Sequence, residues 1–187
     1  MKFLKNRLVA VLLVALMVVG STCLSATAKL NKAADKVSDG FYNGVRAGGY
    51  LHPAIGEQLE NLCGVVSGVT VVANKYGLDT ASITDLRQEL GRAVTLRSRD
   101  YEKLYSYYSQ LTVALDQLRE LLMAADISQA DAAVLTKYTD TAAALALTIR
   151  DAGYNESVSR FVQETMEGFP ASLFVRLFAL AGPAYFA

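Results

Sequence analysis

The amino-acid sequence predicts an all-α protein: an elongated antiparallel up-and-down helical bundle, with three to four long helices and a C-terminal apolar tail. Three observations lead to this prediction. The chain of 187 residues has only three prolines, and residues 54–169 contain none, so the strongest helix breaker is missing there. No glycine lies between Arg92 and Ala152. Apolar residues recur every three or four positions along four segments, which is the period of an amphipathic helix.

The composition sets limits on the class of protein. Hydrophobic residues make up 52% of the chain, and 18 basic side chains balance 18 acidic ones. This apolar content is too high for a disordered chain and is enough for the core of one globular domain. A chain without net charge is also not a strongly basic nucleic-acid binder, so we expect no nucleic-acid partner.

The N-terminal 28 residues have the order of a secretory signal peptide. Basic residues precede an apolar run from Leu8 to Val19, and the small-x-small triplet Ala26-Thr27-Ala28 follows. This order predicts a signal peptide over residues 1–28 and a helical-bundle domain over residues 29–187. Twelve helical residues span about 18 Å, short of the ~30 Å hydrocarbon core of a membrane. The alternative is an uncleaved anchor from Leu8 to Leu24.

Removal of residues 1–28 changes both the charge and the cysteine content of the chain. The remaining 159 residues carry 15 basic and 18 acidic side chains, and Cys63 is their only cysteine. An internal disulfide is then excluded, and the fold depends on its hydrophobic core. We expect an extracytoplasmic protein, either secreted or in the periplasm or at the cell surface, or else a single-pass membrane-anchored one.

The sequence of the first half of the domain predicts two helices. A spacing of three and four residues indicates an amphipathic helix over about 30–47, which Gly48 and Gly49 interrupt. A second helix extends over about 53–76, with Pro53 at its first position and Gly77 as its C-terminal cap. Its centre carries no charge, so we expect it to be the buried helix of the domain.

The second half predicts two longer helices. Ser82 and Asp85 form a capping signal for a helix that continues to about Ala124, and Ser128 and Asp131 repeat that signal for a helix that ends before Gly168. Each segment has about 40 residues, or about 60 Å of helix. The short turns between them make neighbouring helices antiparallel.

Few side chains offer chemistry. His52 is the only histidine and lies beside Pro53 at an expected break, and Cys63 lies in an apolar stretch. A lone histidine does not form the paired ligands of a di-iron bundle. We therefore expect no catalytic residue, no metal and no cofactor. The mixed charges of residues 85–103 indicate a solvated helix face, and the tyrosines of residues 101–108 indicate core and rim packing.

The C-terminal stretch, residues 169–187, is strongly apolar. Fourteen of its 19 residues are apolar, and Arg176 is its only charged residue. Such a tail is unstable when exposed to water. We expect it to fold back over the bundle, with Phe174 and Phe178 buried. The alternative is a tail that contacts a membrane or a partner.

The C-terminal part also contains a motif. Its residues are Tyr154, Asn155, Val158, Phe161, Phe169, Pro170, Leu173, Phe178, Tyr185 and Phe186. This order resembles the signature of the LemA family, which reads Tyr-Asn-x-x-Val-x-x-Tyr-Asn, then Phe-Pro, then a short apolar helix that ends in an aromatic pair. The second Tyr-Asn pair is replaced, and the family's Arg-Arg-x-Asp-Leu-Ile-Pro-Asn-Leu stretch is missing. The chain is therefore identified as a divergent member.

The resemblance implies a bacterial helical bundle behind an N-terminal hydrophobic segment, and it brings no catalytic residues with it. Tyrosine buries its ring while its hydroxyl group finds a partner, and asparagine bonds to the backbone where a chain turns. We therefore expect the motif to be structural and to close the fold.

These observations favour a non-enzymatic, exported or membrane-associated bundle that acts through an envelope protein partner. Membrane contact would come through the N-terminal segment or the apolar tail. The alternative is an extracytoplasmic ligand-binding or sensory bundle. A closed apolar core favours the first hypothesis, and a polar-lined cavity among Tyr101, Tyr105, Arg97 and Arg99 favours the second.

Overall fold

The computed structural model describes residues 7–168, 172, 175–176 and 182–187. The chain divides into two compact units. The first contains residues 1–37 and 159–183, and the second contains residues 38–158 and 184–187. The second unit contains most of the helices.

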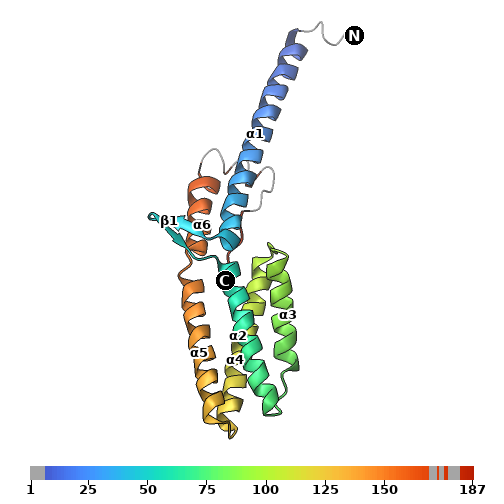
Figure 1. The fold of residues 1–187 in the computed structure, drawn as a ribbon. Helices are drawn as coiled ribbons and strands as arrows, with labels where there is room; N and C mark the ends of the chain where they lie inside the picture. Colours follow the sequence, from blue (N-terminus) through green and yellow to red (C-terminus); the bar gives the residue numbers. More distant parts are fainter. Residues whose placement is uncertain (1–6, 169–171, 173–174, 177–181) are drawn as a thin grey trace. The chain divides into compact units, whose positions relative to one another are not determined.

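Helices dominate the described part of the chain, which confirms the all-α prediction (Figure 1). The elements in chain order are α1 (Arg7–Asn43), β1 (Val45–Ala47), β2 (Tyr50–His52), α2 (Ile55–Lys75), α3 (Ala81–Thr95), α4 (Tyr101–Ala124), α5 (Gln129–Arg150), α6 (Tyr154–Phe161) and a π-helical turn (Val162–Met166).

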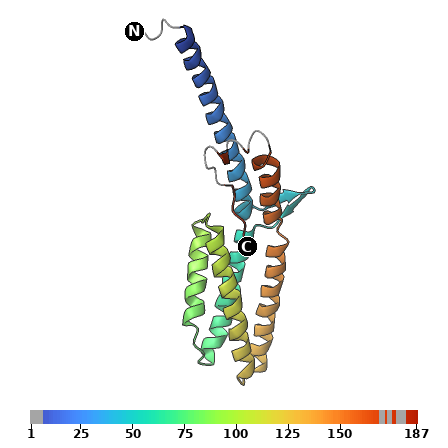
Figure 2. The same ribbon diagram turned by 180° about the vertical axis from the view of Figure 1, so that it is seen from behind.

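Helix α2 is the buried helix of the second unit, as its uncharged centre predicted. Twelve of its residues are buried, and it contacts α3, α4 and α5. Figures 1 and 2 show α2, α3, α4 and α5 side by side, with the turns between consecutive helices at alternating ends. Leu59, Val66 and Val69 have no exposed surface. Burying one such side chain stabilises the fold by about 1.5–3 kcal/mol.

Gly77 ends α2 as predicted. Its φ is 69°, in the left-handed region, and its N–H donates to the carbonyl oxygen of Asn74. The N–H of Leu78 donates to the carbonyl oxygen of Ala73. Together these bonds form a Schellman motif, which satisfies two carbonyl groups at the end of the helix.

The prediction of one helix from residue 82 to about 124 is wrong, because α3 ends at Thr95 and α4 begins at Tyr101. A second Schellman motif ends α3: Arg97 and Ser98 donate to the carbonyl oxygens of Val94 and Ala93. Arg97 takes the left-handed position, with a φ of 49°. Glycine is the usual residue in this conformation, and arginine rarely adopts it. Because Arg97 stands here, the sequence has no glycine to mark the break.

The caps of the next helices also differ in part from the expectation. Asp100 caps α4 by accepting a hydrogen bond from the N–H of Lys103, and Ser128 caps α5 as predicted, through the N–H of Asp131. The expected cap at Ser82 is wrong, because α3 begins at Ala81 after Thr80, whose side chain makes no capping bond.

The fourth predicted helix is interrupted. Helix α5 ends at Arg150, and α6 starts at Tyr154 after a turn in which Gly153 has a φ of 71°. This left-handed glycine breaks the helix between the apolar positions that predicted its continuity. The apolar pattern therefore keeps its helical period across a turn that redirects the backbone.

The predicted helix over residues 30–47 is shorter at its C-terminal end. Helix α1 ends at Asn43, and a β-hairpin follows in which Val45 pairs with His52 and Ala47 with Tyr50. Gly48 and Gly49 form its turn, with φ values of 58° and 85°. Two successive positive φ values match the twist of a tight hairpin, which explains the Gly-Gly pair.

The N-terminal part of α1 carries the apolar run. In the described part of the chain, α1 is the one helix that is long and apolar enough to cross a membrane, a test that a signal sequence also passes. Residues 11–20 are all exposed, and Met17 and Leu24 are 71% and 75% exposed. The helix continues through Ala28, after which the sequence predicts cleavage.

The apolar tail is described only in part. Phe169, Pro170, Leu173, Phe174 and Phe178 lie outside the described residues, so their expected burial stays a prediction. Residues 184–187, here called the tail segment, belong to the second unit. Phe186 is buried, whereas Tyr185 is 45% exposed.

Candidate functional site

Five side chains of the second unit hold the tail segment and are here called the tail site. They are Phe41, Tyr105, Tyr108, Tyr154 and Asn155. They come from the C-terminal end of α1, the first turns of α4 and the first turn of α6. The left-handed turn before Tyr154 redirects the chain after α5, so the Tyr-Asn pair begins a new helix beside the tail segment.

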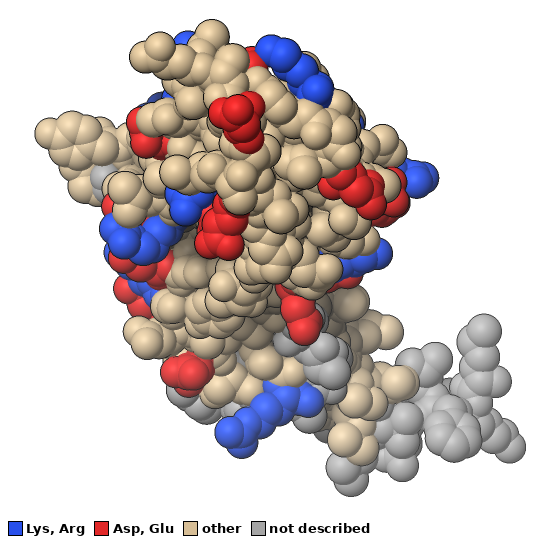
Figure 3. Space-filling view, turned by 90° about the horizontal axis from the view of Figure 1, so that it is seen from below, with Lys and Arg blue, Asp and Glu red and all other residues tan. Residues whose placement is uncertain are grey.

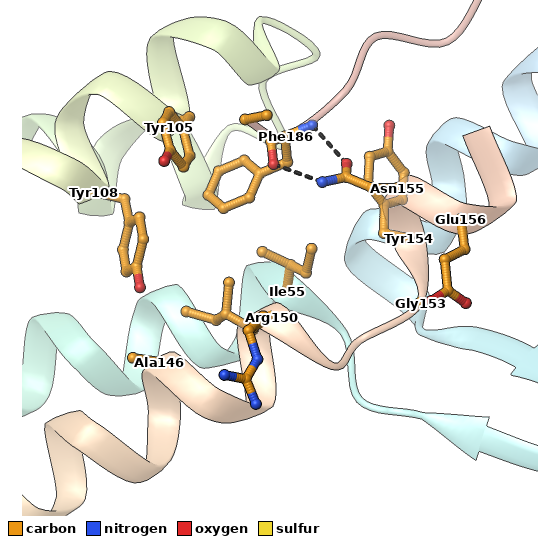
Figure 4. Close-up of a pocket in the computed structure, with 12 residues that line it drawn as sticks. Ile55, Tyr105, Tyr108, Ala146, Arg150, Gly153, Tyr154, Asn155, Glu156 and Phe186 are labelled. Carbon is orange, nitrogen blue, oxygen red and sulfur yellow. Dashed lines mark hydrogen bonds between the residues drawn. The ribbon is translucent and has the colours of Figure 1, made fainter. Parts of the chain in front are cut away.

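Asn155 holds the backbone of the tail segment with both ends of its amide. Its Nδ2 donates to the carbonyl oxygen of Phe186 at 2.8 Å, and the N–H of Phe186 donates to its Oδ1 at 2.8 Å (Figure 4). The hydroxyl group of Tyr154 donates to the carbonyl oxygen of Ala184 at 2.9 Å. Three hydrogen bonds therefore fix the tail segment through its main chain alone.

The ring of Phe186 occupies an aromatic cluster. Its centroid lies 5.3 Å from that of Phe41, 5.3 Å from that of Tyr105 and 5.8 Å from that of Tyr108. The first two contacts are edge-to-face, an arrangement that adds about 0.5–1.5 kcal/mol per pair beyond the burial of area. Phe41 also contacts the ring of Tyr154 at 5.4 Å, so the side chains that hold the main chain and the ring support each other.

The inner tyrosines are hydrogen-bond donors. Tyr101 donates to the carbonyl oxygen of Ser38 at 3.0 Å, and Tyr42 donates to that of Ser98 at 2.7 Å. Burial raises the pKa of Tyr42 to about 12 and also raises the pKa of Tyr101 and of Tyr154. These phenols stay protonated at neutral pH, so they act as structural donors rather than as bases or nucleophiles.

A cavity of about 290 Å³ lies beside Phe186 (Figure 4). Ile55 and Ala146 contribute apolar surface, and Tyr105 and Tyr108 contribute rings and hydroxyl groups. No hydrogen bond of either hydroxyl group is found among the described residues. Burial raises the pKa of Tyr108, so its hydroxyl group stays a donor. The volume lies just below the range for ligand sites, which is about 300–1,000 Å³.

Charged groups border the same cavity with both signs. Arg150 and Glu156 line it, and Nε of Arg150 donates to Asp151 Oδ1 at 2.9 Å. Both members of that ion pair are largely exposed, so water screens their interaction. The cavity therefore has no strong preference for an anion or for a cation.

The remaining candidates for chemistry lie elsewhere. His52 is in β2, and Cys63 is buried in α2, with its sulfur 3.7 Å from the carbonyl oxygen of Arg87. Burial raises the pKa of Cys63 to about 11, so the thiol is neutral and a poor nucleophile. Across the described ranges, no three histidine, cysteine or acidic side chains form a group that could hold a metal ion.

The structure brings part of the sequence motif together. Tyr154, Asn155 and Phe186 meet in the tail site, and Val158 is fully buried. Phe161 is also buried, and Tyr185 is partly exposed. The rest of the motif falls on Phe169, Pro170, Leu173 and Phe178, which lie outside the described residues.

The sequence did not identify Phe41, Tyr105 and Tyr108 as partners of the tail segment. Phe41 was part of an apolar stripe and is fully buried, whereas the tyrosines were part of a stripe expected in the core and at its rim, and Tyr105 is 37% exposed. Their contacts with Phe186 join residues that are far apart in the sequence, and no local spacing encodes such contacts. The available signal was two glycines at element boundaries near the site. Gly44 follows the end of α1 and Gly153 precedes the start of α6, and both have a positive φ.

The surface charge has no single sign on the face shown in Figure 3. Acidic and basic side chains are interspersed there among uncharged ones. This distribution agrees with the equal numbers of acidic and basic residues in the sequence. It gives no support for binding to a polyanion, which requires a basic patch or stripe.

Comparison with known proteins adds no relative to these observations. No family model, no curated protein and no solved structure matches this chain. The role of the tail site is therefore inferred from its own contacts.

Proposed function

We propose that the chain is a non-enzymatic LemA-type helical-bundle protein of the bacterial cell envelope, exported or membrane-associated, which acts through a protein partner. Helices α2 to α5 form its antiparallel up-and-down scaffold. The observation that carries the proposal is the exposed apolar run in α1. Eight large apolar side chains between Val11 and Val19 are 41–71% exposed. An exposed apolar patch of this kind marks a surface that contacts a membrane or a protein.

The N-terminal order of charges favours export. Lys2, Lys5 and Arg7 precede the apolar run, and Ala26 and Ala28 provide the small side chains of a cleavage site. The proposal places the bundle outside the cytoplasm, as a secreted, periplasmic or cell-surface protein, after cleavage behind Ala28. An uncleaved segment leaves the same bundle attached to the membrane by one helix.

The chemistry of the described side chains supports a role without catalysis. The thiol of Cys63 is buried with a raised pKa, and the tyrosines of the tail site serve as donors to backbone carbonyl groups. A general base needs a pKa near the working pH and access to a substrate. Neither group meets both requirements.

The LemA assignment is supported by the contact between two parts of the motif. Tyr154 and Asn155 bind the main chain of Ala184 and Phe186, about thirty residues further along. In the proposed family relationship, the Tyr-Asn pair and the final aromatic pair are shared because they close the fold together.

The fate of residues 1–28 tests the cellular part of the proposal. The full chain is produced in a bacterial host, the envelope and soluble fractions are separated, and the N-terminus and mass are determined. We expect a chain that begins at Lys29. Replacing Ala26 and Ala28 by leucine should block processing, because large side chains do not fit this site. The matched control replaces Ala33 and Ala34 by leucine.

An intact Met1 in the envelope fraction would contradict cleavage and favour the single-pass anchor. A chain with an intact Met1 in the cytosolic fraction would contradict both forms of the proposal. In the control variant, processing should be unchanged.

The cavity beside Phe186 favours a second candidate function, an extracytoplasmic ligand-binding or sensory bundle. Of the four residues that were expected to line such a cavity, Tyr105 lines this one, whereas the buried Tyr101 packs against Phe41 at 4.7 Å. Arg97 does not line the cavity, and its guanidinium group lies 5.1 Å from the centroid of the Tyr42 ring. A thermal-shift screen of small amphipathic molecules tests this function, and Tyr108→Ala should abolish any shift that the cavity causes.

A further inference from the structure

The tail segment is bound in a way that is largely independent of its sequence. Asn155 pairs with the N–H and the carbonyl group of one residue, and Tyr154 binds the carbonyl group two residues earlier. Any extended segment presents these same main-chain groups in the same order. The tail site therefore recognises an extended backbone rather than one particular sequence.

The side chains of residues 185–187 alternate as in a bound strand, because Tyr185 and Ala187 are exposed and Phe186 between them is buried. Phe186 is 5% exposed and its ring points toward Tyr105 and Tyr108, whereas Tyr185 is 45% exposed (Figure 4). Successive residues of an extended chain point to opposite sides. Main-chain bonds for affinity and a pocket for one side chain of the pair are the features of peptide-recognition sites that bind an extended segment.

The tail segment leaves part of its site empty. Phe186 and Ala187 border the cavity of about 290 Å³, together with Tyr105 and Tyr108, whose hydroxyl groups have no partner among the described residues. The side chain of Ala187, the residue after Phe186, is a single methyl group. An unfilled apolar space forfeits contact energy, so a larger apolar side chain at that position would bind better.

We propose that the tail site is a binding site for an extended segment of the partner protein, in which an aromatic residue is followed by a large apolar one, and that residues 184–187 compete for the same site. The proposal rests on the proposed function, because it specifies how the partner is recognised. The tail segment has the advantage of being attached to the chain, and the partner segment has the advantage of filling the cavity.

The competition can be measured on the purified full chain in detergent. Phe186→Ala removes the aromatic anchor of the tail segment and leaves all five residues of the tail site intact. The probe is a fluorescein-labelled peptide, Gly-Pro-Ala-Tyr-Phe-Leu with an amidated end, followed by fluorescence anisotropy. We expect the variant to bind the peptide at least tenfold more tightly than the wild-type chain, because its own tail no longer competes.

Three controls separate recognition from non-specific adhesion. A peptide with alanine in place of its phenylalanine should lose at least tenfold in affinity. A peptide that ends in alanine instead of leucine should bind several-fold more weakly, because it leaves the cavity empty. Adding Asn155→Ala to the Phe186→Ala chain should also cost at least tenfold, because both main-chain hydrogen bonds are lost.

Loss of stability in Phe186→Ala does not prevent the test. If the variant is partly unfolded, saturating peptide should restore its helical circular dichroism and raise its melting temperature, since a ligand that binds the folded state stabilises it. The peptide without phenylalanine should do neither.

The proposal would be overturned if the Phe186→Ala chain does not bind the peptide and if saturating peptide restores neither its helical signal nor its melting temperature. Equal affinity for all three peptides, or no effect of Asn155→Ala, would also overturn it. A wild-type dimer that the peptide dissociates would identify the occupant as the tail of a second copy and overturn the assignment to a partner. None of these outcomes depends on export, so the proposed envelope location is tested independently by the N-terminal sequence.

Discussion

Asn155 and Phe186 show how two residues far apart in the sequence share one structural task. The asparagine amide satisfies both main-chain groups of Phe186, so the backbone of a buried residue is hydrogen-bonded without any sheet. A buried backbone group without a partner costs about 1–3 kcal/mol. The aromatic cluster then supplies the apolar part of the contact. The main chain and the side chain of Phe186 are therefore stabilised by different neighbours.

Asn155→Ala tests the main-chain part of this contact. We expect a loss of about 1–3 kcal/mol in the free energy of unfolding, because two hydrogen bonds disappear and the half-buried groups of Phe186 lose their partners. Chemical denaturation monitored by circular dichroism measures it. The control is Asn61→Ala, an exposed asparagine of α2, which should change stability by less than about 0.5 kcal/mol. Equal effects would contradict the role of Asn155.

Phe186→Ala tests the side-chain part. Truncation of a buried phenylalanine costs about 3–5 kcal/mol, which is a large share of a typical total of about 5–15 kcal/mol. Tyr185→Ala, at the neighbouring exposed position, should cost much less. Melting curves of both variants make the comparison. A change at Phe186 no larger than that at Tyr185 would show that the tail segment does not contribute to the core.

At the scale of elements, two glycines of α2 in one Gly-x-x-x-Gly pair have opposite roles. A Cβ atom added at Gly64 meets nothing within 4 Å, whereas one added at Gly68 clashes with the ring of Tyr138 on α5. Gly68 therefore provides the space in which the tyrosine ring packs between the two helices. Gly64 occupies an ordinary exposed helical position, where glycine is unfavourable.

The same substitution should therefore have opposite effects at these two positions. We expect Gly64→Ala to stabilise the protein by about 0.5–1 kcal/mol through helix propensity. Gly68→Ala should destabilise it by about 1 kcal/mol, because the ring of Tyr138 has to leave its space. Urea denaturation measures both. In a Tyr138→Ala background the two substitutions should become equivalent, and a difference that persists would contradict the assigned contact.

Asp131 joins the end of α2 to the start of α5. Its carboxylate accepts hydrogen bonds from Lys75 at 2.6 Å, Tyr76 at 2.5 Å and Ser128 at 2.6 Å. These bonds, that of Lys75 first, hold the pKa of Asp131 well below its ordinary value of 3.8. A lowered pKa in the folded state means that the contribution to stability is complete above the unfolded value and is lost as the pH falls below it.

Asp131→Asn should therefore lower the melting temperature at pH 7. The difference in melting temperature between the variant and the wild type, here called the gap, should narrow as the pH falls below about 4. Melting curves between pH 7 and pH 2 measure the gap. Asp126 lies in the turn before α5 and makes no such bonds within the described part of the chain, so Asp126→Asn should leave the melting temperature unchanged at every pH. A gap that is constant with pH would contradict the role of the carboxylate.

The helical class and the buried helix follow from sequence patterns, but several element boundaries do not. The uncharged stretch of α2, Gly77 and Ser128 gave correct predictions because each acts through neighbours in the sequence. The break between α3 and α4 was missed because Arg97 adopts a conformation that glycine normally marks, and because Asp100 resembled one charge of a solvated face. For the tail site, the motif indicated Tyr154, Asn155 and Phe186, but long-range packing alone selects Phe41.

At the scale of the whole molecule, the second unit contains its own core. Phe41, Tyr101, Tyr154 and Phe186 all belong to residues 38–158 and 184–187. The N-terminal 28 residues contribute none of these contacts. The helical bundle therefore does not require them for its core.

A chain that begins at Lys29 should melt cooperatively at a temperature close to that of the full chain in detergent. Its helical signal should fall only by the share of residues 7–28. Circular dichroism at equal concentration measures both quantities. A deletion of residues 29–43 as well, which removes Phe41, should abolish the transition. Loss of cooperativity in the first variant would show that the apolar run supports the bundle.

The continuity of α1 has a consequence for the timing of the proposed cleavage after Ala28. Ala28 lies inside a helix that extends from Arg7 to Asn43, with all backbone groups around it committed to the helix. A peptidase cuts an opened segment, and proteolysis of a folded segment follows the population of its open form. A helix forms within about a microsecond, far faster than a typical enzyme turns over. The proposed cleavage would therefore have to draw on transient unwinding near Ala28, and the stability of this one helical turn would set how quickly the chain is released.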